Sequence, residues 1–308
     1  MVLPIDLGKV KSVAEDIKSM IEVEIDCNIY VDKSCNKDLV SSIKDMFSSA
    51  KEVGVNFIDI DDKKLFLEYQ PNFAIILAGK DEYCSLIHKA LELKNVASFI
   101  VTLDPATLLS QSKAQDIKIM KSNLICPISR HYLKSTSSNG DSYLNINKYN
   151  SAMDKDIKIK IYKWFYSFAD SYMIAYSSKF PFLREGTAKK VISTCSIENA
   201  GFGLLNFVPG IDLPLITLNY AKMVLRLAAI YGYKINEDRI PELVALLLTS
   251  FAMKYAKKTI DKAKGINKFL LNGTFSYGGT QLLGNIAKSY FASGQAFDGL
   301  RDKIAAAF

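Results

Sequence analysis

The stretch Phe73-Ala-Ile-Ile-Leu77 is an uninterrupted apolar run with the length of a buried β-strand. Three further runs in the first half of the chain have the same character: Cys27–Val31, Val55–Ile60 and Ala97–Leu103. Segments with the apolar spacing of helices separate these runs, notably Asp38–Ala50 and Cys84–Leu93. Buried strands that alternate with helices are typical of a mostly parallel sheet flanked by helices. The sequence therefore predicts an α/β domain in residues 1–105.

Binding sites in sheets of this kind lie beyond the carboxyl ends of the strands. In this chain those ends are polar: Asp32-Lys33-Ser34, Asp61-Asp62-Lys63, Gly79-Lys80-Asp81-Glu82 and Thr102-Leu103-Asp104-Pro105. The layout suggests a nucleotide-binding-like domain with a Rossmann or GTPase-like strand order. The turn after the first strand is the place to test that idea.

This turn, Val31-Asp-Lys-Ser-Cys-Asn-Lys-Asp38, lacks the features of a phosphate-binding loop. Such a loop needs glycines, which let successive backbone N–H groups approach the anion, followed by Lys and Ser or Thr. The turn offers Lys33, Ser34 and Lys37 as weak candidates, but it has two acids and no glycine. The missing glycines remove the anion nest. We therefore predict a degenerate nucleotide-binding fold and expect no cofactor.

The alternative is a nucleotide-dependent switch of the GTPase-like class. In that case Lys33, Ser34 and Lys37 would hold phosphate without glycines. Asp61 or Asp81 would then bind magnesium.

The remaining reactive side chains form no catalytic or metal-binding pattern. The two histidines, His88 and His131, lie far apart, and neither has a carboxylate motif beside it. The five cysteines are odd in number and have no CxxC spacing, which indicates reduced thiols in a cytosol. They are Cys27, Cys35, Cys84, Cys126 and Cys195. We predict that the protein is not an enzyme and is cytoplasmic.

The second half of the chain is predicted to be helical. Residues 106–150 are rich in turn residues and are predicted to be a linker or an edge element, with an extension of the α/β domain to residue 130 left open. From Ala152 to Tyr176 apolar and aromatic residues repeat every three or four positions, so we expect one long amphipathic helix. Gly232 is a predicted helix stop. Residues 151–308 are assigned to an all-α domain.

An apolar stretch within this domain, Asn199–Pro214, is broken by Pro209-Gly210 and holds a single acid, Asp212. A charge in such surroundings is costly unless a partner group pairs with it. The candidate partners are Lys222, Arg226 and Arg239. Loss of Asp212 is therefore expected to weaken the fold or partner binding.

This stretch and its flanks resemble the YcjF-like family. The resemblance covers about residues 160–295, and it also involves Thr217 and Gly279-Thr280. The matching positions, which we take as structural or interface residues, are Asn199, Gly201, Pro209, Gly210, Asp212, Pro214, Asn219, Lys222, Arg239 and Glu242. The family is a bacterial domain of unknown function, often fused to or encoded near small GTPases. The resemblance supplies no catalytic residues, and it implies that residues 1–150 are similar to a GTPase-like domain that has lost its phosphate loop.

The net charge of +7 comes from the second half of the chain. Residues 1–150 have 18 lysines and arginines against 20 acids, whereas residues 151–308 have 21 against 12. A basic, apolar half favours an acidic partner such as an anionic membrane surface. Only five of the 39 basic residues are arginine, which weakens the case for nucleic acid.

These observations predict a non-enzymatic interaction or scaffold module, in the cytoplasm or at the inner membrane surface. We expect a protein partner, with a small GTPase as one candidate, and an anionic membrane surface as another; no nucleic acid is expected. A third possibility is an integral membrane protein with a helical hairpin. Its candidate segments, 199–221, 243–253 and 269–287, are too short or too polar for a clear transmembrane span.

Overall fold

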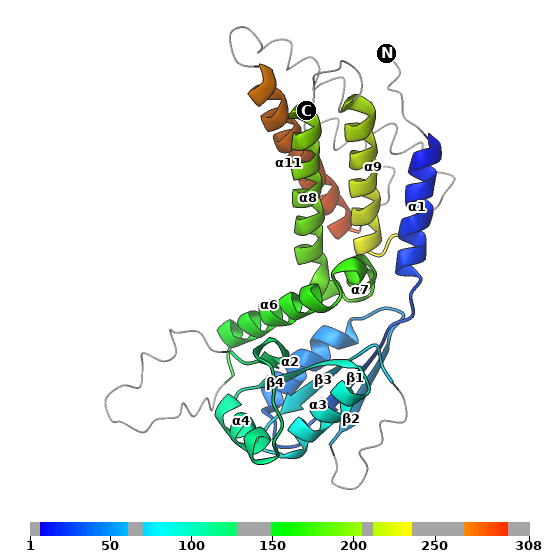
Figure 1. Ribbon diagram of the computed structural model, residues 1–308. Coiled ribbons are helices and arrows are strands. Elements are labelled where there is room, and N and C mark those ends of the chain that lie inside the picture. The colour runs from blue at the N-terminus through cyan, green and yellow to red at the C-terminus, as the bar shows by residue number, and fades with distance from the viewer. Residues whose placement is uncertain (1–6, 61–69, 128–148, 205–211, 236–267, 295–308) are drawn as a thin grey trace. The chain divides into compact units, whose positions relative to one another are not determined.

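The computed structural model describes residues 7–60, 70–127, 149–204, 212–235 and 268–294 (Figure 1). The chain divides into two compact units. Glu24–Met173 form one, here called the sheet unit. Met1–Val23 and Ile174–Phe308 together form the other, the helical unit. The predicted fold class, a parallel α/β part followed by a helical part, is confirmed.

The sheet has five parallel strands in the order β2-β1-β3-β4-β5. The strands are β1 (Asp26–Val31), β2 (Gly54–Asp59), β3 (Phe73–Ala78), β4 (Ala97–Thr102) and β5 (Leu124–Ile125). The first four coincide with the predicted apolar runs to within one residue at each end. The central strand β3 is buried along its whole length, as expected for a strand with helices on both faces.

The strand order refines the predicted one. Strand β1 lies between β2 and β3, whereas the Rossmann order has β1 between β2 and β4. In the order found here the chain reverses direction across the sheet between β1 and β3, so the topological switch point lies at the carboxyl ends of these two strands. Ligands of open α/β sheets bind at such a point.

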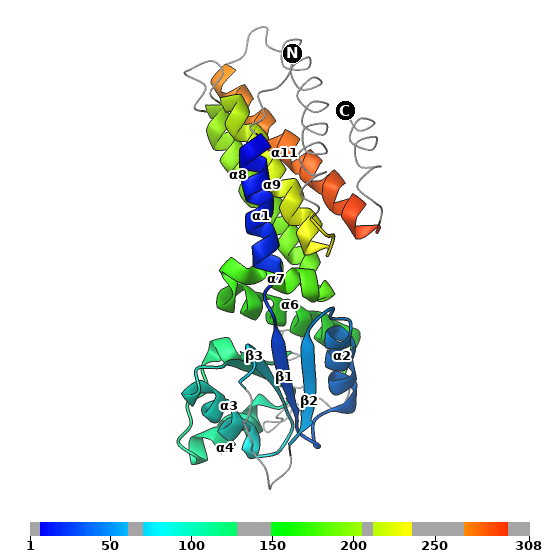
Figure 2. The same ribbon diagram turned by 90° about the vertical axis from the view of Figure 1, so that its right-hand side faces the viewer.

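Helices cover both faces of this sheet (Figure 2). On one face α2 (Lys37–Ser48) and α6 (Ser151–Phe168) pack through aromatic rings. The ring of Phe73 lies 4.9 Å from that of Phe165, and Phe99 lies 4.5 Å from Trp164. On the other face α3 (Tyr83–Leu93) and α4 (Pro105–Ala114) enclose an aliphatic core.

The boundary that follows the sheet differs from the predicted one. The aromatic stripe of α6 packs on the sheet, so residues 151–168 belong to the sheet unit and not to the helical one. The helix also ends earlier than predicted, at Phe168, and a 3₁₀ turn at Asp170–Tyr172 leads to α7 (Met173–Lys179). Within the predicted linker, α4 and β5 are regular elements, and β5 is the expected edge strand.

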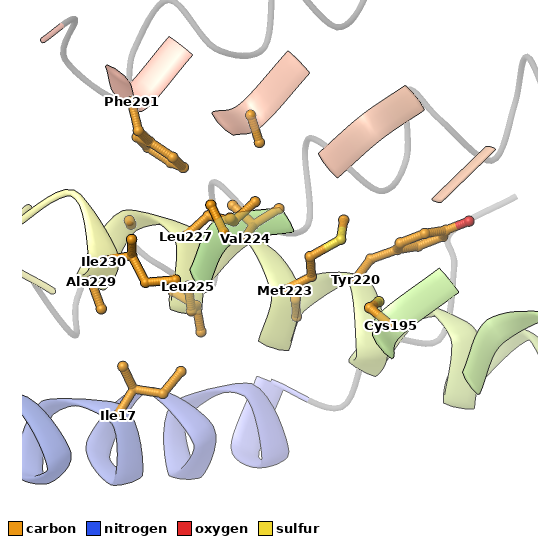
Figure 3. Close-up of a cluster of buried hydrophobic side chains, with 14 of the residues drawn as sticks. Ile17, Cys195, Tyr220, Met223, Val224, Leu225, Leu227, Ala229, Ile230 and Phe291 are labelled. Carbon is orange, nitrogen blue, oxygen red and sulfur yellow. The ribbon is translucent and has the colours of Figure 1, made fainter. Parts of the chain in front are cut away.

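The helical unit is built around α9 (Asp212–Ile230). Its neighbours are α1 (Leu7–Ile21), α8 (Arg184–Leu204) and α11 (Lys268–Ala292). Figure 3 shows side chains from these helices, among them Ile17, Cys195 and Phe291, around the buried face of α9. Helix α1 therefore packs against a helix that follows it by about two hundred positions in the sequence.

Two glycines shape the helical unit. Gly232 ends α9 as predicted: its φ is +79°, and the N–H groups of Gly232 and Tyr233 donate to the carbonyls of Ala229 and Ala228 in a Schellman motif. Gly284 of α11 lies against α8 and α9. A Cβ atom at this position would come within 2.7 Å of Ile192 and 3.1 Å of the Met223 sulfur.

Candidate functional site

The switch point of the sheet is filled by the carboxylate of Asp32, which follows β1 directly and is 2% exposed. One carboxylate oxygen, Oδ2, accepts hydrogen bonds from the backbone N–H groups of Gly79, at 2.7 Å, and Asp81, at 3.0 Å. The other, Oδ1, accepts from the N–H of Ser34, at 2.7 Å, and from its hydroxyl, at 2.8 Å. The Ser34 hydroxyl also lies 3.0 Å from Oδ2, and the Cys84 thiol lies 3.9 Å from the same oxygen.

Gly79 allows the turns after β1 and β3 to approach this closely. A Cβ atom at Gly79 would lie 2.4 Å from Ser34 Oγ, 2.5 Å from the Ser34 carbonyl carbon and 2.6 Å from the Cys35 nitrogen. The backbone of one turn therefore leaves no room for a side chain on the other. The N–H of Lys80 also donates to Ser34 Oγ, at 2.7 Å. Glycine is required here for close backbone approach.

The donors around Asp32 decide its charge state. Burial raises the pKa of a carboxyl group, but the hydrogen bonds from Asp81, Ser34 and Gly79 outweigh burial and lower the pKa of Asp32. Its carboxylate is therefore ionised at neutral pH. Burial and the nearby Asp32 charge raise the pKa of Cys35 to about 12, and the pKa of Cys84 rises for the same two main reasons. Both thiols stay protonated.

The candidate phosphate-binding residues lie at the switch point of the sheet, but their arrangement differs from that in a phosphate-binding loop. Lys33 and Lys37 are exposed, whereas the hydroxyl of Ser34 is engaged with Asp32 and with the N–H of Lys80. The turn after β1 contributes one backbone N–H group to the Asp32 carboxylate, that of Ser34. Converging N–H groups are present, because the turn after β3 supplies Gly79, and the Asp32 carboxylate sits among them.

The switch hypothesis predicted two magnesium ligands, Asp61 and Asp81, and the structure describes one of them, Asp81. Asp81 Oδ1 accepts a hydrogen bond from the N–H of Tyr83 at the start of α3, at 2.9 Å. Asp61 lies outside the described residues. Among the described residues, no group of three or more His, Cys, Asp or Glu side chains could hold a metal ion.

A second polar cluster lies in the interior of the helical unit, where α8, α9 and α11 meet. The side chain of Asn199 accepts a hydrogen bond from Asn219 Nδ2, at 2.9 Å, and donates one to Thr280 Oγ1, at 3.0 Å. Thr280 in turn donates to the Ser276 carbonyl, at 2.6 Å, and lies 3.3 Å from the Tyr220 hydroxyl. Asn199 and Thr280 are fully buried. Side chains from three helices are thus joined in one hydrogen-bond network.

The structure places the other motif residues apart from this network or leaves them undescribed. Gly201 is exposed on α8, and a Cβ atom there would meet nothing within 4 Å. Lys222 is partly buried on α9. Pro214 falls in the first turn of α9, where proline is tolerated. The positions outside the described residues are Pro209, Gly210, Arg239 and Glu242.

The predicted ion pair between Asp212 and Lys222 or Arg226 is wrong. Helix α9 is continuous from Asp212 to Ile230, so Lys222 lies ten residues along the same helix. Ten residues correspond to about 15 Å along a helix axis, and Arg226 is farther still. Neither cation can pair directly with an acid at the helix start. The third candidate, Arg239, lies outside the described residues.

The sequence indicated Asn199, Asn219 and Thr280 only through the family resemblance, without the hydrogen bonds that join them. It indicated Asp32 only as part of a strand end. A signal for Asp32 did exist: a single acid directly after a buried strand and a glycine directly after the neighbouring strand, Gly79. Recognising their pairing requires the strand order, which periodicity does not supply.

The family comparison concerns the unit that holds the Asn199 network. Residues 174–306 match the family model described as Domain of unknown function (DUF697). The match begins at residue 174, which is also the first residue of the C-terminal part of the helical unit. The matched segment therefore contains α8, α9 and α11 but not α1. No curated protein matches this chain, and no solved structure does.

Proposed function

We propose that this protein is a non-enzymatic interaction module in which the sheet unit is a scaffold and the helical DUF697 unit recognises an acidic partner. The observation that carries the proposal is the Asp32 carboxylate at the switch point. It uses the donors that a phosphate group would need, and its negative charge repels a phosphate. The scaffold role follows because the usual ligand position of this fold is taken by the chain itself.

The distribution of charge supports the helical unit as the recognising part. By the observed boundaries, the sheet unit has 19 basic and 19 acidic residues and is neutral. The helical unit has 20 basic and 13 acidic residues, so it accounts for the whole net charge of +7. A positive unit attracts acidic surfaces and speeds their association.

A protein is the partner we favour, and a small GTPase is the first candidate because of the YcjF-like resemblance. The test is recovery of partners by the full chain from native cytosol and solubilised membranes. A variant with Lys222→Glu and Arg226→Glu, both partly buried on α9, is expected to recover far less of the partner. The matched control is Lys33→Glu with Lys37→Glu, which makes the same charge change in the sheet unit. Equal recovery by both variants would contradict the proposal, provided that both have wild-type melting temperatures.

An anionic membrane surface is the second candidate, favoured by the charge of the helical unit. Sedimentation with phosphatidylglycerol vesicles and with phosphatidylcholine vesicles distinguishes it from a purely protein partner. Binding to the anionic vesicles alone, weakened by 0.5 M salt, would support it, because salt screens exposed charges.

A helical hairpin inserted in the membrane gives a different outcome in fractionation. No described helix combines the length and apolar character that a transmembrane span needs. Alkaline carbonate is expected to release the protein from membranes. Retention in the pellet would support insertion instead.

The nucleotide-dependent switch is tested by calorimetric titration of the full chain with GTP and with ATP in the presence of Mg²⁺. We expect no binding at micromolar concentration. Micromolar binding that Lys33→Ala abolishes would replace the scaffold proposal with the switch, because Lys33 is the exposed cation nearest to Asp32 in the sequence.

A further inference from the structure

We propose that the carboxyl ends of β1 and β3 form a complete binding site for a small carboxylate, and that the chain's own Asp32 side chain is its resident ligand. The site is the set of donors provided by Ser34, Gly79 and Asp81. When the Asp32 side chain is removed, the vacated site is expected to bind free formate.

The hydrogen bonds to Asp32 come from a distant loop as well as from its own turn. An aspartate that only shaped its own turn would need no more than the bonds to Ser34, two residues on. The N–H groups of Gly79 and Asp81 come from a turn 47 and 49 residues away. Two separate loops therefore direct donors at one point, as they do around bound anions in sites built from backbone N–H groups.

The arrangement of the donors around Asp32 matches the shape of a carboxylate. The donors to the two carboxylate oxygens are all neutral: three backbone N–H groups, the Ser34 hydroxyl, which reaches both oxygens, and the Cys84 thiol. A planar anion with two oxygens satisfies this arrangement. The close approach of the Gly79 N–H depends on the absence of a side chain there, since a Cβ would clash with Ser34 and Cys35. The site is thus built for a carboxylate, with glycine at its tightest point.

The site also occupies the position in the fold where a ligand is expected. It lies at the topological switch point, between the strands where the chain changes direction across the sheet. A binding site in an open α/β sheet is expected there. Because the Asp32 side chain occupies that position, the hydrogen-bond donors of the site are satisfied without an external ligand.

The experiment replaces the resident ligand with a free one. Asp32→Gly removes the carboxylate and leaves room for formate, whereas Asp32→Ala keeps a Cβ that obstructs it. Thermal unfolding of the full chain is followed in increasing sodium formate and, separately, in sodium chloride at equal concentrations. Asp32→Gly is expected to melt below the wild-type protein in chloride. Formate should raise its melting temperature by about 2 °C or more above the chloride curve, because a ligand that binds only the folded state stabilises it.

The controls separate binding from a general salt effect. The wild-type protein and Asp32→Asn, which retains the shape of the side chain, should respond equally to formate and chloride. Asp32→Ala should respond less than Asp32→Gly. In Asp32→Gly the amide resonances of Gly79 and Asp81 should shift on addition of formate, while that of Gly232 in the helical unit should not. Identical formate and chloride curves for Asp32→Gly would overturn the proposal.

Failure of Asp32→Gly to fold also gives a decisive result. In that case formate, present during refolding, is expected to restore the native circular dichroism spectrum, and chloride is not. Equal recovery of folded protein in the two salts, or no recovery in either, would overturn the proposal.

Discussion

The side-chain amide of Asn219 on α9 donates a hydrogen bond to the side-chain oxygen of Asn199 on α8, 2.9 Å away in the interior of the helical unit. The same Asn199 side chain donates to Thr280 on α11, so one residue connects three helices. Buried polar groups of this kind cost little while every partner is present, and much when one is removed. The network therefore favours one register of the three helices over others.

Replacement of Asn219 by alanine is expected to destabilise the protein by about 1–3 kcal/mol, because it leaves the buried oxygen of Asn199 without its donor. Urea unfolding followed by circular dichroism measures the effect. Asn285→Ala is the matched control: Asn285 is exposed on α11, and among the described residues its side chain donates to Gln281 of its own helix. It should change stability by less than about 0.5 kcal/mol. Equal effects of the two substitutions would show that the network contributes nothing specific.

The contact of Gly284 with α8 and α9 predicts a second stability effect. Gly284→Ala places a methyl group within 2.7 Å of Ile192, which is itself buried, and is expected to cost about 1–3 kcal/mol. Gly278→Ala in the same helix is the control, because a Cβ atom there meets nothing within 4 Å. That control should stabilise α11 by about 0.5–1 kcal/mol, the usual gain for alanine over glycine in a helix. Stabilisation by both substitutions would contradict close packing at Gly284.

The lowered pKa of Asp32 predicts a dependence of stability on acid pH. Because the folded pKa lies below the unfolded value of about 3.9, the ionised form stabilises the fold fully at pH values well above 3.9. This contribution is lost as pH falls through the folded pKa. The titratable neighbours of Asp32 are Cys35, Cys84 and Asp81, and the two thiols stay protonated throughout. The difference in unfolding free energy between the wild-type protein and Asp32→Asn should therefore shrink from pH 6 to pH 3. A constant difference would contradict an ionised Asp32.

The cysteines are expected to differ in reactivity with iodoacetamide at pH 8. Burial raises the pKa of Cys195 to about 12, so this thiol is almost entirely protonated at that pH. Cys126 is only partly buried and lies near Lys160, which lowers its pKa against the rise from burial. Mass spectrometry of the native protein should show labelling of Cys126 first. In guanidinium chloride all five cysteines should react at similar rates.

The spacing of apolar residues was sufficient to predict strands that are buried on both faces and helices that are buried on one face. The runs around Ile29 and Ile75 are apolar because both faces of their strands are covered, so the pattern alone predicts a parallel sheet. Gly232 is similar, since a glycine after an apolar helical stretch is a local stop signal.

Partners distant in the sequence could not be predicted in this way. The stripe that contains Trp164 and Phe165 predicts a buried face, but it does not tell whether the face meets a sheet or other helices. The same holds for Ile17 of α1, whose partners on α9 lie some two hundred positions later. The predicted domain bounds therefore differ from the bounds of the two compact units.

The contacts within both polar clusters depend on distant partners in the same way. Asn199 and Asn219 were selected through the family resemblance, but their hydrogen bond depends on how α8 and α9 pack. The two cations proposed for Asp212 were excluded by a simple fact of helix length. Asp32 was visible as an acid after a strand, yet its donors on Gly79 and Asp81 come from another loop.

Because α1 precedes the sheet unit in the chain and α9 follows it, the order of synthesis on the ribosome matters for this protein. At about 5–20 residues per second, α1 leaves the ribosome roughly 10–40 s before α9 does. During that interval the nascent sheet unit can complete its fold, while the apolar face of α1 at Val10, Ala14 and Ile17 stays uncovered. The apolar face of α1 thus gains its partner helix α9 only when the last third of the chain is being translated.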